Sequence, residues 1–480
     1  MRALNALLAA AALAAPLAAE ARARITIVNA NQPGIGFNDP TPVAPLPTNP
    51  GTTVGQQRLI AFQHAADLWG KELDSKVEIR VQASFVPLAC TATAAVLGSA
   101  GPIQVFSDFP GARFPGTWYH VALANKLARE DLAPGDPGTV ADDIRARFNA
   151  NLGQPGCLQG SGWYYGLDIH QPPSQINLVV VLLHEFAHGL GFSSFTSPTT
   201  GEMLLGQPTV YDKFYFDLTT GKFREQMTDA ERVASAINVR NVAWVGREVT
   251  ESVREVLQRG TPVLTVRAPA AVAGAYQVGT ASFGPALTAA GVTGKVVLGQ
   301  DAADAAGPST TDGCSPLANA AEVAGNIALV DRGACGFVVK AANAQAAGAT
   351  ALIVADNQPG RPPAGLGGAD PSITIPAVRI TRDDGALLKA ELANGVIANI
   401  GLDLRVRAGA SPQGFALLNA PDPVQPGSSI SHWDPIATPN QLMEPAINPD
   451  LTFSVEEPED LTSSLFEDIG WHEGRGRKKN

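Results

Sequence analysis

The sequence predicts an α+β protein with at least two domains. Its 480 residues allow more than one hydrophobic core, since 45% of them are hydrophobic and only 16% are charged. Before residue 260, apolar residues recur both at helical and at strand spacing, which favours an α+β region there. From Thr261 onward alanine, valine and glycine dominate, and strand-like runs surround one clear helix. This change of composition indicates a second domain of α/β type.

The elements of the first region follow from local patterns. ARITIVN predicts a short strand, and the Pro, Gly and Asn residues from Asn31 to Gly55 predict a loop. Helical spacing of apolar residues predicts a helix from Gln56 to Leu73, and alternation predicts a strand from Val77 to Phe85. Between Thr91 and Pro173, short apolar runs mix with Gly and Pro, so strands and loops are expected.

Residues 1–23 have the features of a secretory signal peptide. Arg2 precedes an Ala/Leu-rich stretch, and Ala21-Arg22-Ala23 fits a cleavage site after Ala23. We therefore expect a secreted, extracellular or periplasmic protein with no stable membrane insertion. Cleavage removes two positive charges and one negative charge, which changes the formal charge from −11 to −12. An acidic chain of this kind is not expected to bind nucleic acid.

The four cysteines are expected to form two disulfides, because their number is even and the chain is expected to be exported. Three pairings are possible in principle. Proximity in sequence favours Cys90 with Cys157 and Cys314 with Cys335. No C-x-x-C pair occurs, so a metal site made of cysteines is not favoured.

The run QINLVVVLLHEFAHGLGF predicts a buried helix that begins after a cap at Ser174 and ends at Gly189 and Gly191. His184 and His188 are four positions apart and so project from one helix face, where both imidazoles can reach one Zn²⁺. Glu185 stands beside the first ligand, as expected for the general base of a metallopeptidase.

A third ligand is needed, and it does not follow nearby. In the metzincin pattern H-E-x-x-H-x-x-G-x-x-H, Gly191 takes the glycine position, but the last ligand position falls on Ser194, which is a poor zinc ligand. The remaining histidines are the candidates: His64, His120, His170, His432 and His472.

HEFAHGLGF, SHWD, NQLMEP and the closing SLFEDIGW together resemble the leishmanolysin-like branch of the metzincins, in which an insertion separates the second and third zinc histidines. The resemblance implies that His432 is the third zinc ligand and that Met443 is the methionine of the turn beneath the metal. Asp434 and Glu444 remain alternative oxygen ligands. Unlike leishmanolysin, this chain has few cysteines, so a cysteine-rich C-terminal domain is not expected.

His188 and His432 are 244 residues apart, so a whole domain is expected between them. The run CSPLANAAEVAGNIALVDRGACGFVVKAANAQAAGATALIVADN, followed by ITIPAVRITRDDGALL, resembles a protease-associated (PA) domain, in which Cys314 and Cys335 would staple the β-structure. The predicted organisation is a catalytic region at 24–260, a PA-like β-rich insert at 261–407 and the rest of the catalytic region at 408–480. The Pro-rich NAPDPVQPGSS is interpreted as the returning linker.

These patterns predict a secreted zinc endopeptidase of metzincin type that hydrolyses protein or peptide substrates. Its cleft is expected between the helix of HEFAHGLGF and the segment from His432 to Pro445. The alternative is a catalytically inactive, zinc-stabilised PA-domain protein that binds peptides or surface polymers. An aminopeptidase would in addition need a site for a free amino terminus.

Overall fold

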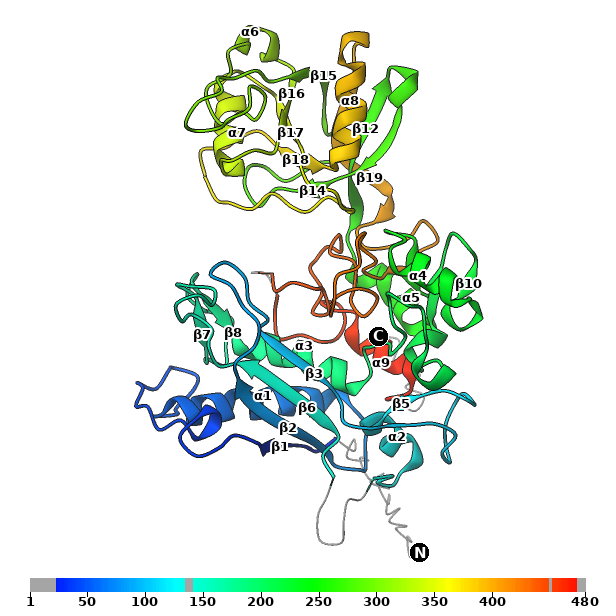
Figure 1. Cartoon of the computed structure of the whole chain (residues 1–480). Coiled ribbons are helices and arrows are strands. Elements are labelled where there is room, and N and C mark those ends of the chain that lie inside the picture. The colour runs from blue at the N-terminus through cyan, green and yellow to red at the C-terminus, as the bar shows by residue number, and fades with distance from the viewer. Residues whose placement is uncertain (1–22, 134–140, 449–450, 473–480) are drawn as a thin grey trace, which may run out of the picture.

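The structure is a computed structural model that describes residues 23–133, 141–448 and 451–472. Figure 1 shows a lower body, made of residues 23–258 and 408–472 within these ranges, and an upper body made of residues 259–407. Apart from Ala23, the predicted signal peptide lies outside the described residues. Among the helices described, none has the length and apolar character needed to cross a membrane.

A four-stranded sheet forms one half of the lower body. Its strands, in spatial order, are β1 (Ile25–Asn29), β2 (Ile79–Val86), β6 (Ile144–Asn149) and β3 (Gly98–Pro102). The first three are parallel, and β3 runs antiparallel to β6 at the edge. The helices α1 (Val54–Glu72) and α3 (Leu178–Leu190) pack against each other, α1 beside β1 and α3 across β3 and β6. The sheet and α1 therefore form the platform on which α3 rests (Figure 1).

The predicted strands and helix of this half are confirmed to within a few residues. α1 begins after Thr53, whose side-chain hydroxyl accepts a hydrogen bond from the backbone N–H of Gln56. Phe62 of α1 meets Phe148 of β6 edge-on, with ring centroids 5.0 Å apart. Strand β2 alternates buried and half-buried residues along its length, as the sequence pattern predicts for a strand with one face toward a core.

The segment between residues 91 and 173 was predicted as strands and loops, and this prediction is wrong for one helix. Six of the eight residues of that helix are buried, so its sequence, VALANKLA, has no polar face that would show helical periodicity. A disulfide joins Cys90, just before the segment, to Cys157 within it. Besides β3 and β6, the elements here are β4 (Val105–Phe106), β5 (Tyr119–His120), α2 (Val121–Ala128), β7 (Gly162–Tyr164) and, just beyond, β8 (Gln175–Asn177).

The predicted buried helix is present as α3, but it begins later than expected. Asn177, not Ser174, is the N-cap, and its side-chain oxygen accepts from the backbone N–H groups of Val179 and Val180. Residues 175–177 are instead extended, because β8 pairs with β7. At the other end Gly191 has φ of +139°, a conformation that favours glycine, and it turns the chain sharply away from the helix.

The other half of the lower body contains residues from both sides of the upper body. Its sheet, in spatial order, consists of β10 (Lys222–Phe223), β9 (Tyr215–Asp217), β11 (Val242–Trp244) and β20 (Ala416–Leu417). The helices here are α4 (Asp229–Ala236), α5 (Arg247–Val256) and α9 (Thr462–Ile469). Because β20 already pairs with β11, the chain has returned before NAPDPVQPGSS begins. The interpretation of that stretch as a linker is wrong: Ala420 is buried in the same core as α3.

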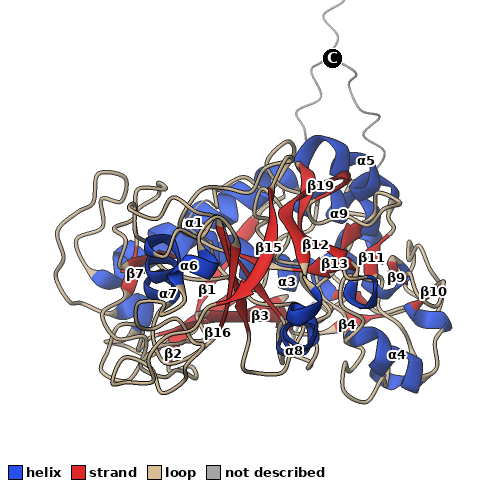
Figure 2. Ribbon diagram, turned by 90° about the horizontal axis from the view of Figure 1, so that it is seen from above, coloured by secondary structure: helices blue, strands red, loops and turns tan. Residues whose placement is uncertain are grey.

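The upper body is built around an eight-stranded mixed sheet. Its strands, in spatial order, are β13 (Gly274–Gln277), β12 (Arg259–Ala268), β19 (Ile397–Arg407), β15 (Val292–Leu298), β16 (Ile327–Asp331), β17 (Ala351–Ala355), β18 (Ala377–Ile380) and β14 (Gly279–Thr280). Alternate residues of β16 enter two different cores: Leu329 faces the core shared with α8 (Arg382–Glu391), and Val330 the core shared with α6 (Ala320–Val323) and α7 (Phe337–Ala346). The helices therefore cover opposite faces (Figures 1 and 2).

Two long antiparallel strands, β12 and β19, connect the bodies. They carry the chain into the upper body and back out beside each other. At their base, the backbone N–H of Ala408 donates to the carbonyl of Gln258 at 3.0 Å. The second disulfide, Cys314–Cys335, lies within the upper body, so both bonds follow the pairing that proximity favours.

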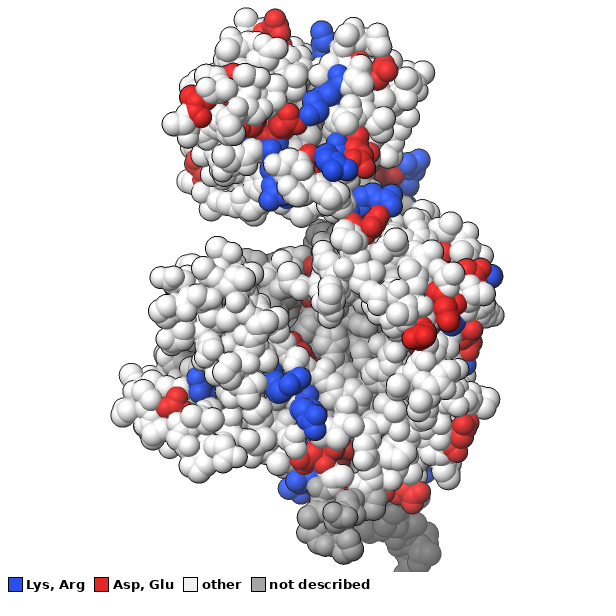
Figure 3. Space-filling model, in the orientation of Figure 1, with Lys and Arg blue, Asp and Glu red and all other residues white. Residues whose placement is uncertain are grey.

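Figure 3 shows acidic and basic side chains interspersed over one face of the molecule, with broad uncharged areas between them. This distribution agrees with the low share of charged residues in the sequence, 16%.

Candidate metal centre

Three histidines from distant parts of the chain meet in the lower body. His184 and His188 lie one turn apart on α3, and His432 reaches them from the segment after β20. One ring nitrogen from each lies within 4.8 Å of the other two, and the Nε2 atoms of His184 and His432 are 3.2 Å apart. Within the described residues, this is the cluster of histidine, cysteine or carboxylate side chains that could hold a metal ion.

The other ring nitrogen of each histidine is occupied by a backbone carbonyl. A carbonyl oxygen only accepts, so each Nδ1 carries the proton and each Nε2 is left with a free lone pair. The acceptors are Leu442 O for His184 at 2.7 Å, Phe192 O for His188 at 2.8 Å and Ser428 O for His432 at 2.9 Å. This arrangement fixes the tautomer and ring orientation of a metal-binding histidine.

The spacing of two of these nitrogens suits a tetrahedral zinc ion. Ligand nitrogens about 2.0–2.1 Å from Zn²⁺ at tetrahedral angles stand about 3.3 Å apart, close to the 3.2 Å between His184 and His432. Burial lowers the pKa of His184 to about 4 and that of His188 to about 3, and it lowers the pKa of His432 well below its usual value. All three imidazoles are therefore neutral near pH 7, as metal ligands must be.

Glu185 lies on α3 next to this cluster and faces the edge strand β3. Burial raises the pKa of its carboxyl to about 8, while a hydrogen bond with the backbone of Ala100 acts in the opposite direction. Gly98 of β3 leaves room for it, because a Cβ atom there would lie 2.9 Å from the Glu185 Cγ. A bound cation would favour the ionised carboxylate.

Met443 is fully buried in a turn that also supports His184. The residue before it, Leu442, supplies the carbonyl that accepts from His184 Nδ1, and its own N–H donates to Asp460 at 2.6 Å. The backbone N–H of Trp433, next to His432, donates to the Met443 carbonyl at 2.8 Å. The turn thus connects two of the three histidines.

The alternative oxygen ligands are engaged elsewhere. The Asp434 carboxylate lies 3.7 Å from Arg240, and Glu444 accepts from the N–H of Gln441 and the amide of Asn448. The other described histidines, including His472, are also outside the cluster. His64 lies beside Phe453, and His120 Nε2 is 2.7 Å from the hydroxyl of Ser193. His170 is exposed beside Asp168.

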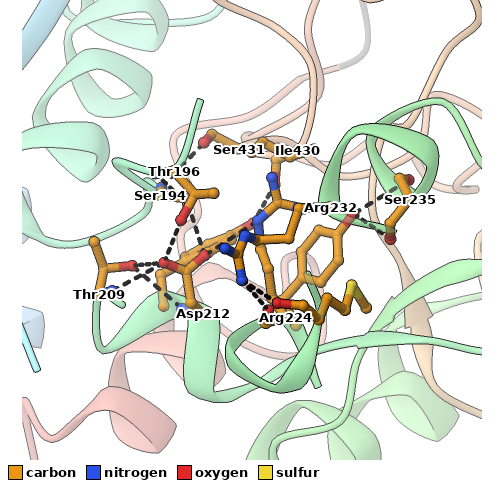
Figure 4. Close-up of polar contacts among 12 residues, drawn as sticks. Ser194, Thr196, Thr209, Asp212, Arg224, Arg232, Ser235, Ile430 and Ser431 are labelled. Atoms are coloured by element: carbon orange, nitrogen blue, oxygen red, sulfur yellow. Dashed lines mark hydrogen bonds and ion pairs between the residues drawn. The ribbon is translucent and has the colours of Figure 1, made fainter. Parts of the chain in front are cut away.

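Ser194, at the pattern's third-ligand position, does not face the metal cluster. Its hydroxyl donates to Asp212 at 2.6 Å, within the buried polar network of Figure 4. Asp212 and its neighbour Tyr211 were not singled out from the sequence, where an aspartate in a loop carries no distinguishing pattern. The signal that could have pointed to them was Ser194, because a serine at a ligand position must have a hydrogen-bond partner other than the metal.

A cavity of about 860 Å³ lies between the two bodies. Residues 358–367 of the upper body form one wall, and the lower body contributes Asp422 and Glu444, the latter next to Met443. The lining contains no residue of α3, so this cavity differs from the cleft expected between α3 and the segment from His432 to Pro445.

The expectation of a PA-like domain is confirmed in part: residues 292–388 match the PA domain family. Similar proteins include Signal peptide peptidase-like 2 of Arabidopsis thaliana, 42% identical over 85 residues, which are 17% of this chain and 15% of that protein. Vacuolar-sorting receptor 2 of the same plant is 34% identical over 158 residues, or 30% of this chain and 24% of the receptor. The Probable lipoprotein aminopeptidase LpqL of Mycobacterium tuberculosis is 34% identical over 142 residues, which are 29% of this chain and 25% of that protein. The chain therefore spans a quarter or less of the length of these relatives.

Among solved structures, the zinc aminopeptidase BSAP from Bacillus subtilis is 25% identical over 32% of this chain and 36% of that one, with a TM-score of 0.22. An aminopeptidase from Aneurinibacillus sp. strain AM-1 is 20% identical over 41% of this chain and 42% of that one, with the same TM-score of 0.22. Scores this low do not establish a shared overall fold.

Proposed function

We propose that this protein is a secreted, zinc-dependent peptidase in which His184, His188 and His432 hold the metal and Glu185 is the general base. The observation that carries the proposal is the convergence of one ring nitrogen from each of three histidines while each Nδ1 lies against a backbone carbonyl. Histidines buried only for packing have no need of three directed, unprotonated nitrogens at one point. The two disulfides support export, because such bonds persist in oxidising compartments.

The roles of the side chains follow from their places. The histidines would bind through Nε2, and their carbonyl partners keep the rings from rotating. When bound, zinc supplies Lewis-acid chemistry, which polarises a peptide carbonyl and makes water more acidic. The Glu185 carboxylate would accept a proton from the attacking water and give it to the leaving amine, and a bound cation would favour the ionised form that the first transfer needs.

Substitution of Glu185 tests the proposal directly. Glu185→Gln should keep zinc at one equivalent per chain and lower hydrolysis of a casein-type substrate by about 10²–10⁴-fold, the usual contribution of a general base. Glu202→Gln, at an exposed loop position, is the matched control. Zinc content and chelator sensitivity are measured on the same preparations. Undiminished turnover by Glu185→Gln would contradict the assignment.

The metal ligands are tested in the same way. His432→Ala should lose zinc together with activity, whereas His170→Ala should keep both, because the His170 side chain is 84% exposed. Full zinc occupancy in His432→Ala would remove His432 from the ligand set.

Within this function, we propose an endopeptidase of metzincin type. The HEFAHGLGF helix and the distant SHWD and NQLMEP segments, which the structure brings together, support this choice. The likeness to the protein named lipoprotein aminopeptidase supports the other possibility, an aminopeptidase. Peptides with blocked and free amino termini separate the two, since an aminopeptidase requires the free terminus.

A second candidate function is peptide binding without cleavage, which the likeness to vacuolar-sorting receptors favours. The PA-like body would then bind a peptide or surface polymer, and zinc would only stabilise the lower body. Zinc at full occupancy without chelator-sensitive cleavage of any peptide in a mixed library would select this function.

A further inference from the structure

Ser194 stands where the metzincin pattern has its third histidine, and it contacts the segment that supplies the histidine instead. Its backbone N–H donates to the hydroxyl of Ser431 at 3.2 Å, and Ser431 directly precedes His432. We propose that Ser194 and Tyr211 are positioning residues that hold the segment of residues 428–432 so that His432 reaches the metal. This inference rests on the proposed function and deepens it.

The Ser194 side chain is fixed by a buried carboxylate. Its hydroxyl donates to Oδ1 of Asp212 at 2.6 Å, and Asp212 is fully buried. Oδ2 of Asp212 accepts from the hydroxyl of Thr196 at 3.1 Å and from both the N–H and the hydroxyl of Thr209 at 2.9 Å. The guanidinium of Arg224, equally buried, lies 3.5 Å from Oδ1 (Figure 4). Because the Asp212 carboxylate that accepts from it is held from several sides, the Ser194 hydroxyl is fixed in position.

Tyr211 holds the same segment at the residue just before Ser431. Its hydroxyl donates to the carbonyl of Ile430 at 2.9 Å, and its ring packs on Phe192 with centroids 5.6 Å apart. Phe192 in turn supplies the carbonyl that accepts from His188 Nδ1. Since Tyr211 and Asp212 are neighbours in the short helix η3 (Tyr211–Lys213), one element fixes two metal-ligand segments.

The backbone conformation of Ile430 indicates that the segment of residues 428–432 depends on surrounding contacts to keep its shape. Its φ is +67°, in the left-handed region that a β-branched residue rarely adopts, and its side chain is buried. Strained residues of this kind persist only where their surroundings over-determine them. Here the N–H of Ile430 donates to Asn419 O at 2.7 Å and its carbonyl accepts from Tyr211. The resulting turn lets Ser428 O accept from His432 Nδ1.

The competing explanation is that these contacts only stabilise the fold. The two explanations differ in one measurable respect. A structural contact lowers the stability of the metal-free protein, whereas a positioning contact also weakens metal binding, because partners beyond the ligands typically contribute 10- to 100-fold in metal affinity.

The test compares Tyr211→Phe with Tyr215→Phe. Both tyrosines are fully buried, and each change removes one hydroxyl; that of Tyr215 bonds to Ser235 and not to residues 428–432. The full chain is used, and zinc affinity is measured by chelator competition beside the unfolding midpoint of the metal-free protein. We expect similar losses of midpoint, but a 10- to 100-fold weaker zinc affinity only in Tyr211→Phe.

Ser431→Ala is the second variant, because it removes the acceptor of the Ser194 N–H without touching the Asp212 network. It should weaken zinc in the same range and change the visible spectrum of the Co²⁺-substituted protein, which reports ligand geometry. If Tyr211→Phe does not fold, this variant decides. Wild-type protein that binds no zinc would overturn the proposed function and this inference together. Wild-type affinity in Ser431→Ala and Tyr211→Phe would overturn the positioning role alone.

Discussion

Substitution of Gly98 by alanine tests whether the edge strand β3 sets the position of Glu185. The added Cβ would lie 2.9 Å from Glu185 Cγ and 3.1 Å from its Oε1, where ordinary contacts begin near 3.4 Å. Phe148 closes the other side at 3.0 Å, so the glutamate must move by about half an ångström, and a displacement of about 1 Å typically lowers a rate by about 10²-fold. We therefore expect Gly98→Ala to lower kcat by roughly 10- to 100-fold.

Gly101 provides the matched control, because it lies in the same strand and an added Cβ there meets nothing within 4 Å. The assay measures kcat and KM on a fluorogenic peptide, together with zinc content and the unfolding midpoint. Gly98→Ala should retain zinc, since the three atoms nearest to the new methyl group belong to Glu185 and Phe148 and not to a histidine. Equal kcat values for the two variants, or a loss explained by missing zinc, would refute the reasoning.

Two further predictions concern stability. The Cys314–Cys335 bond joins residues 21 apart, so the double change to serine should lower the stability of the upper body by about 3 kcal/mol in calorimetry while zinc affinity stays unchanged; a parallel loss of zinc would contradict it. Burial raises the pKa of Asp468 to about 6, so the folded protein binds this proton more tightly than the unfolded chain does. Stability should therefore be highest below about pH 4 for this group and fall by at most roughly 3 kcal/mol as the pH rises to about 6. Urea unfolding of Asp468→Asn should lack this component, and an identical pH profile would show that the pKa is not raised.

Local spacing was sufficient to predict the part of the candidate centre that lies on one helix. His184, Glu185 and His188 depend only on helical geometry, and α3 places them as that geometry requires. The start of α3 was mistaken because Ser174 and Asn177 are equally good caps in sequence. What distinguishes them is the pairing of β8 with β7, a contact that the segment's own residues do not encode.

The carbonyl partners of the histidines could not be predicted at all. Leu442, Phe192 and Ser428 contribute only backbone oxygen, which any residue would supply. The same holds for the strained turn at Ile430, where the sequence shows an isoleucine that would suit a strand. His432 was predicted as a ligand through a resemblance to a family and not through spacing, because 244 residues separate it from His188.

The paired strands β12 and β19 show where the upper body is inserted into the chain of the lower body. At their base the carbonyl of Gln258 accepts from the N–H of Ala408. The whole upper body is therefore inserted into the chain of the lower body as the tip of a hairpin. The tip also contacts the lower body, where the backbones of Arg361 and Asp422 exchange two hydrogen bonds of 2.7 Å, ten residues before His432. An upper body that keeps the hairpin base and this contact could therefore vary in sequence elsewhere, because none of the three clustered histidines belongs to it.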